Sequence, residues 1–423
     1  MRILLAQLFR YAGALHGGPK ANRLLLQALA AGGHACRVVV PFQDEIVDAM
    51  RADLAGSGID LSAIFQHVQS LREIEEHARG LRWLSDDTVA FEVDGVEVIA
   101  LRARPDIEPA FRAALQDFDP QIVLAGEDFQ NRILGNALQV APGRVVVLAH
   151  TVNYLPFGPE AVRLDPERTA MISSAAGVIT VSDFCRRYIQ RWAGLDAQVL
   201  RFPVYGQGPF PSLGSIDNPF VTIINPCALK GIDIFLALAA SMPEVAFAAV
   251  PTWGTTAAEL TALRALDNVT VLEARADVDQ IFAQTRVLLV PSLWAEAFGL
   301  VAVEAKLRGI PALVSSAGGL PEAALGVDRV IEVAPIRWEA SDDAAAPRRR
   351  MVPPQDCTPW RAALGELLAD PVRYHAVSTA GREAALEHVA TCGAGSFAAY
   401  FEAIVARAGG EAAAIAARPR DTG

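Results

Sequence analysis

Short runs of β-branched residues alternate with helical patterns along almost the whole of the 423-residue chain. This alternation is typical of βαβ units, in which helices connect neighbouring parallel strands. Parallel strands lie between layers of helices, so such a fold needs extensive apolar cores. Hydrophobic residues make up 52% of the chain and charged residues only 20%, which supplies these cores. The pattern predicts an α/β fold built from doubly wound parallel sheets.

The alternation is interrupted at residues 202–220, where proline and glycine are dense, as is typical of a linker between domains. We therefore predict a first Rossmann-like domain over residues 1–205 and a second over residues 215–390. Residues 341–357 lack periodicity and are predicted to form a surface loop. Strands are expected at residues 3–8, 35–40, 98–103, 122–125, 145–149 and 177–181 of the first domain, and at 221–225, 245–250, 269–272, 287–290 and 312–315 of the second.

Charge and cysteine content restrict the partners and the compartment. A net charge of −11 disfavours binding to nucleic acid, or to anionic lipid through bulk charge. The five cysteines are scattered and lack metal-ligand spacing, so we expect a reduced, cytoplasmic protein without a bound metal. No apolar run was expected to reach the length of a membrane span. The sequence carries no indication of the oligomeric state.

The most informative segment is residues 291–322, PSLWAEAFGLVAVEAKLRGIPALVSSAGGLPE. It places Glu296 and Glu304 eight residues apart around a Phe-Gly turn that leads into an apolar helical pattern. On one helix this spacing gives a net rotation of about 80° and a rise of about 12 Å, so both carboxylates could border one crevice. The backbone N–H groups of Phe298, Gly299 and Leu300 would form a seat for a phosphate at the start of that helix.

Two further elements suggest phosphate binding. Lys230 and Gly231 follow the strand expected to end at residue 225 and open a helix, so the ammonium group could reach a ligand at the helix start. Lysine is rare in this arginine-rich chain, although a solvated surface lysine is the alternative interpretation. Gly17 and Gly18, in the sequence His-Gly-Gly, lie between the first strand and the first helix, where glycine lets the backbone approach a phosphate closely; a bare turn is the alternative.

The end of the strand at residues 145–149 carries candidates for the reaction itself. His150 follows directly, at the edge of the sheet where ligands bind in open α/β folds, and it could exchange a proton near neutral pH. A structural histidine is the alternative. Asn153, Tyr154 and Phe157 belong to the turn-rich aromatic loop that follows, which is interpreted either as an acceptor-binding loop or as a packed surface loop.

Taken in order, the glycine loop at Gly17, His150, the Lys230 pair and the block from Glu296 to Glu304 resemble the family-4 retaining glycosyltransferases, also called glycosyltransferase group 1, of the GT-B fold. The likeness extends over nearly the whole chain. It is strongest where EAFGLVAVEA matches the family's E-x7-E element and GGLPE its downstream glycine turn. The resemblance implies two Rossmann-like domains that face a central cleft, with a C-terminal helix at about residues 395–410 completing the first domain.

The resemblance also implies roles for the residues. The donor would be a nucleoside-diphosphate sugar, with UDP favoured and GDP, ADP and dTDP left open, and the acceptor would be a small molecule. Glu304 would accept hydrogen bonds from the ribose, and Glu296 would bind hydroxyl groups of the transferred hexose. Lys230 and Gly18, with the N–H groups at the helix start, would hold the diphosphate, so that no metal or other cofactor is needed. His150 would lie near the sugar and stabilise developing positive charge.

One departure from the family pattern concerns the diphosphate. The family commonly has Gly-Arg a few residues before the Lys-Gly pair, whereas this chain has Asn225 and Pro226 there, so the second cation is missing. Arg201 is a candidate substitute. Two alternatives to a transferase therefore stay open: a nucleotide-sugar epimerase of GT-B-like architecture, and a nucleotide-sugar-binding protein without turnover.

Overall fold

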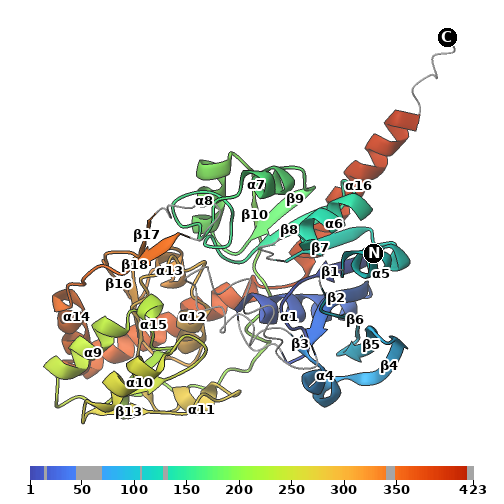
Figure 1. Ribbon diagram of the computed structural model, residues 1–423. Helices are drawn as coiled ribbons and strands as arrows, with labels where there is room; N and C mark the ends of the chain where they lie inside the picture. Colours follow the sequence, from blue (N-terminus) through green and yellow to red (C-terminus); the bar gives the residue numbers. More distant parts are fainter. Residues whose placement is uncertain (14–16, 44–68, 105–106, 127–131, 340–347, 417–423) are drawn as a thin grey trace.

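The computed structural model describes residues 1–13, 17–43, 69–104, 107–126, 132–339 and 348–416. These residues form two sheets, each covered by helices, and Figure 1 shows them as two lobes. The predicted α/β class with doubly wound parallel sheets is confirmed. The predicted linker at residues 202–220 lies between the last strand of the first sheet and the start of the second sheet.

The first sheet has ten strands, and its parallel part alternates with helices along the chain. The predicted strands are found to within a few residues at each end. In spatial order the strands are β10 (Gln198–Val199), β9 (Gly177–Thr180), β8 (Val145–Ala149), β7 (Ile122–Ala125), β1 (Arg2–Ala6), β2 (Ala35–Gln43), β6 (Val96–Arg102), β5 (Thr88–Val93) and β4 (Arg79–Ser85), with β3 (Gln69–Ser70) pairing with β2.

One edge of this sheet was missed by the sequence analysis. Strands β4, β5 and β6 pair antiparallel, as a meander that extends the parallel part of the sheet. The side chains of β4 are mostly exposed, so this strand lacks the apolar signal of a buried strand. It pairs with β5, the next strand along the chain, as a hairpin whose turn is Asp86 and Asp87.

The second sheet has six strands, all parallel. Residues 341–357 were predicted to form a loop. This prediction was wrong for Arg349–Met351, which form a strand of a separate two-stranded antiparallel sheet, whereas residues 352–357 are irregular as predicted and residues 341–347 lie outside the described part. In spatial order the second sheet contains β13 (Val269–Val271), β12 (Phe247–Val250), β11 (Phe220–Ile224), β14 (Thr285–Val290), β15 (Ala312–Ser315) and β16 (Arg329–Ile331), and the small sheet contains β17 (Arg337–Glu339) and β18 (Arg349–Met351).

Helices cover both faces of each sheet. Around the first sheet lie α1 (Gly17–Ala31), α4 (Leu71–His77), α5 (Glu108–Phe118), α6 (Arg132–Val140), α7 (Pro166–Ser173), α8 (Asp183–Ala193) and the C-terminal α16 (Gly395–Ala416). Around the second lie the 3-10 turn η2 (Ala228–Lys230), α9 (Ile232–Ser241), α10 (Ala257–Arg264), α11 (Asp279–Phe282), α12 (Leu300–Leu307), α13 (Leu320–Ala323), α14 (Thr358–Ala369) and α15 (Pro371–Ala390).

Helix α16, in the C-terminal part of the chain, packs against the sheet that the N-terminal part forms. Phe397, Phe401 and Ile404 are buried in the core on one face of the first sheet, together with Leu25 of α1 and Val38 of β2. Figure 1 shows α16 against the first lobe, with its far end extending from the body. Burying three large side chains is worth several kcal/mol, which explains why the C-terminus returns to the N-terminal sheet.

The helical stretch Pro371–Gly409, which includes α15 and most of α16, is long and apolar enough to cross a membrane, judged by length and composition alone. Of its most apolar 18 residues, 17% are buried inside the protein. The expectation that no run reaches this length therefore does not hold by this criterion. Phe397, Phe401 and Ile404 lie inside the protein, so part of the apolar character of this stretch belongs to the core.

Candidate functional site

Lys230 and Glu296 form an ion pair at the ends of two neighbouring strands of the second sheet. The Lys230 ammonium and the Ser292 hydroxyl, the latter at 2.6 Å, both donate to the same oxygen, Oε1 of Glu296. Lys230 follows β11 and Glu296 follows β14, and these strands are adjacent in the sheet. The side chains retain 24% and 15% exposure, so the pair is accessible to a ligand. Two of the residues that the sequence assigned to donor binding, Lys230 and Glu296, are thus brought together.

A close approach of two chain segments explains the glycine after Lys230. Gly231 has a φ of +74°, and a Cβ atom there would lie 2.0 Å from the carbonyl oxygen of Pro291. Any side chain would therefore separate the turn that carries Lys230 from the segment that carries Glu296. The helix predicted after this glycine is confirmed as α9.

The second glutamate meets a lysine from the other lobe. Glu304 lies one turn into α12, and its Oε1 is 3.4 Å from Nζ of Lys20, in the first turns of α1. Tyr205, in the linker, lies near enough that the Glu304 charge, after burial, contributes to raising the pKa of its hydroxyl. Within the described residues, that buried hydroxyl has no hydrogen-bond partner. Glu304 thus has Lys20 of the first lobe and Tyr205 of the linker as polar neighbours.

The start of α12 fits an anion. Its N-cap is Gly299, with a φ of +112°, so no side chain caps the first N–H groups of the helix. A Cβ atom at Gly299 would lie 2.5 Å from Leu320, and one at Gly318 or Gly319 would collide with the backbone of residues 295–297. The glycine turn of GGLPE therefore packs directly beneath the turn that starts α12, and it fixes the N–H groups that were predicted to seat a phosphate.

The helical geometry predicted for the two glutamates was wrong. Helix α12 begins only at Leu300, so Glu296 belongs to the irregular segment before it and only Glu304 is helical. The left-handed conformation of Gly299 and the hydrogen bond from Gly319 N to Glu296 O hold that segment out of the helix. Each glutamate pairs with its own lysine, Glu296 with Lys230 and Glu304 with Lys20.

His150 is held against α1. Its Nε2 is 2.7 Å from Oδ1 of Asn22, which can only accept, so Nε2 carries the proton. A Cβ atom at Gly18 would lie 3.1 Å from the His150 ring, which explains the glycine at that position. Phe202 contacts the ring with a centroid distance of 4.9 Å. Helix α1 already begins at Gly17, so both predicted glycines lie in its first turn, while His16 lies outside the described residues.

The pH dependence of stability should follow two buried histidines. Burial lowers the pKa of His150 to about 4, and burial, with the positive charges of Arg201 and Lys306, lowers that of His388 to about 4. In the unfolded chain both titrate near 6.5, so the unfolded state binds more protons between these values. The free energy of unfolding should therefore fall as the pH drops from about 6.5 towards 4.

Denaturant unfolding over this pH range measures the effect. The double variant His150→Gln/His388→Gln should show a shallower loss of stability than the wild type, whereas His375→Gln, on an exposed position of α15, should keep the wild-type slope. Equal slopes for the wild type and the double variant would contradict the assignment.

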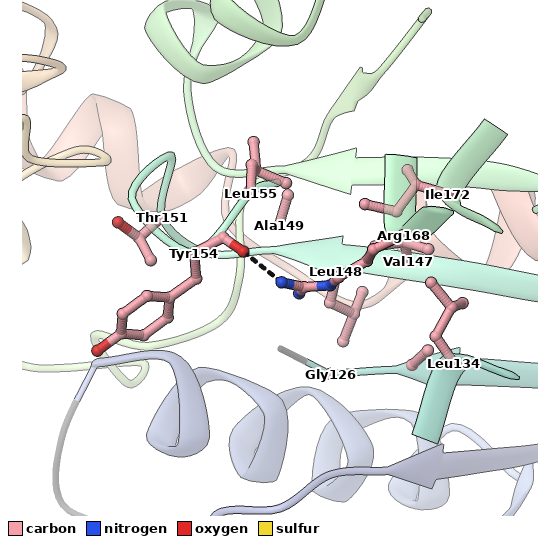
Figure 2. Close-up of a pocket in the computed structure, with 11 residues that line it drawn as sticks. Gly126, Leu134, Val147, Leu148, Ala149, Thr151, Tyr154, Leu155, Arg168 and Ile172 are labelled. Carbon is pink, nitrogen blue, oxygen red and sulfur yellow. Dashed lines mark hydrogen bonds between the residues drawn. The ribbon is translucent and has the colours of Figure 1, made fainter. Parts of the chain in front are cut away.

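The aromatic loop after His150 borders two small hollows, one of which is drawn in Figure 2. Tyr154 lines both, and Arg168 of α7 donates from Nη1 to the Tyr154 carbonyl oxygen at 2.8 Å. Asn153 borders one hollow but is almost fully buried, and its amide group donates to Glu160 O. Phe157 is packed in the core against Tyr188, so the structure does not bring it to these hollows. Of the three residues predicted for the acceptor, Tyr154 is the best placed.

The departure at residues 225 and 226 has a local explanation. Asn225 has a φ of +60°, a conformation that suits glycine and is tolerated by asparagine, and its Oδ1 accepts a hydrogen bond from Gly254 N at 3.0 Å. Asparagine therefore suits the backbone conformation at position 225, where the family pattern has glycine, and Pro226 stands where that pattern has arginine. Arg201, the candidate substitute, donates to the Thr391 hydroxyl at 2.6 Å, at the junction between α15 and α16.

Two contacts tie the lobes together beside this site. The Glu322 carboxylate accepts hydrogen bonds from the N–H groups of Asp183 at 2.8 Å and Phe184 at 2.5 Å, so a residue of the second lobe caps α8 of the first. Arg348, at the start of β18, donates to the carbonyl oxygens of Pro159 and Ala161 in the aromatic loop. The second lobe thereby positions the loop that borders the hollows.

Sequence reasoning missed several of these neighbours. Lys20, Asn22 and Tyr205 carry no motif, because their relevance comes from contacts more than 100 residues away or from burial of a hydroxyl group. The rarity of lysine was the one signal that could have singled out Lys20. Within the described residues, no group of three or more histidine, cysteine or acidic side chains is arranged to hold a metal ion.

The two facing α/β lobes define the chain as a GT-B protein. Residues 255–343 match the family model described as "Glycosyl transferases group 1". The resemblance to this family, inferred from the sequence, is thereby confirmed, with the matched segment lying in the second lobe.

Individual proteins are similar to the chain in part of its sequence or in its fold. The chain is 35% identical over 117 residues to a D-inositol 3-phosphate glycosyltransferase of Segniliparus rotundus; the match covers 27% of this chain and only about a fifth (22%) of the relative's length. A sucrose-phosphate synthase of Thermosynechococcus elongatus has the same fold, with a TM-score of 0.62, 18% identity, and 98% of this chain and 99% of that chain covered. Anabaena HepE, in complex with UDP and glucose, has a TM-score of 0.53 at 16% identity and covers 98% of this chain and 100% of that one.

Proposed function

We propose that the protein is a metal-independent, retaining glycosyltransferase that moves a hexose from a nucleoside-diphosphate sugar to a small-molecule acceptor in the cytoplasm. The observation that carries this proposal is the site around the start of α12. It combines two carboxylates suited to hydroxyl groups, Glu296 and Glu304, with two ammonium groups and uncapped N–H groups suited to phosphates. A nucleotide sugar presents this combination of hydroxyl and phosphate groups.

The proposed reaction breaks the bond between the anomeric carbon and the diphosphate oxygen. Negative charge builds up on the leaving oxygen, and Lys230 together with the positive end of α12 would neutralise it. Glu304 would hold the ribose and Glu296 the transferred sugar, with His150 beside it. The resemblance to retaining enzymes implies that the acceptor attacks from the face that the diphosphate leaves, so Glu296 is not assigned as a nucleophile.

Similar proteins support the donor class and leave the base open. The HepE structure contains UDP and glucose, which makes UDP the first base to test. The S. rotundus relative is named for a phosphorylated inositol, a small hydroxylated acceptor. We propose that Tyr154, with Arg163 and Arg168 near it, contacts an acceptor of this kind.

Nucleotide binding should be visible as a rise in thermal stability. At a concentration 100 times its Kd, a nucleoside diphosphate that binds only the folded state adds about 2.7 kcal/mol to the free energy of unfolding. We expect a shift in melting temperature with at least one of UDP, GDP, ADP and dTDP. Glu304→Ala should reduce that shift, because the ribose loses its acceptor, whereas Glu402→Ala, on an exposed face of α16, should leave it unchanged. No shift with any of the four would overturn the proposal.

Turnover separates the proposed transferase from its two alternatives. The protein is incubated with several sugar nucleotides, with and without an acceptor extract, and the products are analysed by mass spectrometry. A transferase forms a glycosylated product and free nucleoside diphosphate only with the acceptor. Conversion of the donor without an acceptor would instead identify an epimerase, and binding without any product would identify a non-catalytic protein.

A further inference from the structure

All three lysines of this chain pair with carboxylates in or around α12. Lys230 pairs with Glu296, Lys20 with Glu304 and Lys306 with Asp328. The chain has 37 lysines and arginines in total, and all of them except these three lysines are arginines. The Lys306 pair is fully buried inside the second lobe, whereas the other two lysines are partly exposed at the proposed donor site. Two of the three lysines therefore lie where a compact positive charge can reach a ligand.

The arginine that the family pattern places before the Lys-Gly pair is absent here, because Pro226 occupies its position. Arginines elsewhere in the second lobe are engaged by other groups: Arg308 pairs with Asp279 at 2.7 Å, and Arg275 with Glu273 at 2.9 Å. Arg201 is bound to Thr391. Lys20 is the cation that pairs with the Glu304 carboxylate, and it approaches from the first lobe.

We propose that Lys20 supplies the second positive charge for the diphosphate of the donor, in place of the arginine missing at Pro226. This inference rests on the proposed function. Lys20 lies within a turn of Gly18 on α1, and its partner Glu304 lies one turn from the start of α12, so its ammonium group is close to the proposed phosphate seat. The diphosphate would then be held by one lysine from each lobe.

The Lys20 pair is suited to exchange partners. Its N–O distance of 3.4 Å is longer than the roughly 2.8 Å of a strong charge-assisted hydrogen bond, and the side chains are 29% and 18% exposed. Partly exposed pairs of this kind contribute little to stability. When a nucleotide binds, the ribose hydroxyls would engage Glu304 and release Lys20 to the β-phosphate. Without ligand, the same pair neutralises a carboxylate that would otherwise repel the diphosphate.

The test compares nucleotides with one and two phosphates. Calorimetry measures the Kd of the nucleoside diphosphate and the matching monophosphate, with the base chosen by the thermal screen. Lys20→Ala should weaken diphosphate binding by about ten- to a hundredfold, the range expected for one hydrogen bond to a charged group, and monophosphate binding by much less. Lys20→Arg should restore most of the loss, because it returns the charge. Arg72→Ala, which removes an equally positive but exposed side chain of α4, is the matched control and should change neither Kd.

The outcomes separate this inference from the proposed function. If the wild type binds no nucleotide, the proposed function and the role of Lys20 both fail. If the wild type binds the diphosphate but Lys20→Ala weakens both nucleotides equally, or neither, then only the role of Lys20 fails, since a purely structural lysine would not change the ratio of the two Kd values. If the alanine variant is poorly folded, the ratio of the two Kd values is measured instead with Lys20→Gln, which removes the charge but keeps a polar side chain.

Discussion

Replacing Lys230 by alanine should lower the rate of sugar transfer by about two to three orders of magnitude, the usual loss when a group that stabilises transition-state charge is removed. Lys230 is held by Glu296 in the ligand-free protein, so its ammonium group is already positioned at the ends of β11 and β14. In the proposed reaction, the negative charge on the leaving diphosphate grows as the bond to the sugar breaks. The loss should therefore appear mainly in kcat, because the charge on Lys230 matters most in the transition state.

Steady-state kinetics with the donor and acceptor found by mass spectrometry measure this effect. Lys230→Arg keeps the charge but not the compact ammonium geometry, and it should retain part of the activity. Arg72→Ala, with its exposed position on α4, should behave as the wild type. A Lys230→Ala enzyme with an unchanged kcat would show that the lysine does not stabilise the leaving group.

Replacing Lys306 by methionine should destabilise the protein by about 3–5 kcal/mol, because it leaves the Asp328 carboxylate buried without its cation. Both side chains are fully buried, and the ammonium group of Lys306 donates to Asp328. Burial lowers the pKa of Lys306 and raises that of Asp328, while their mutual attraction opposes both shifts. Asp328 also accepts from Ala312 N at 3.4 Å, so the pair connects α12 to the start of β15.

Urea denaturation monitored by circular dichroism measures the loss. The double variant Lys306→Met/Asp328→Leu removes both charges, and it should recover much of the stability that the single variant loses. Because Gly381 of α15 packs against the stem of Lys306, methionine preserves most of that contact. A single variant as stable as the wild type would mean that water reaches Asp328 in the folded state.

The fold was predictable where the sequence signal is local. Strands β7, β8 and β15 were predicted at their observed bounds, because a strand buried on both faces must be a short, almost purely apolar run. The β4 edge strand and the β17–β18 pair were missed, because their residues are largely exposed. Composition carries little information about such strands.

In the candidate site too, the sequence located residues that lie close together along the chain, but it did not give their geometry. Glu296, Glu304, Lys230 and the helix-start glycine were found from their spacing, because these residues lie on the turns that end β11 and β14 or on the helix that follows. The supposed helical relation between the two glutamates was wrong, since Gly299 delays the helix until Leu300.

By itself the sequence determined the α/β class, the position of the linker and the segment that carries both glutamates, because each is written in the periodicity or spacing of neighbouring residues. Only the tertiary structure decided which charges meet. Lys20 lies 284 residues from Glu304, and Glu322 caps a helix 139 residues earlier in the chain. Such pairs depend on how the two lobes face each other, and that geometry follows from the packing of whole sheets and of α16, which no local pattern specifies.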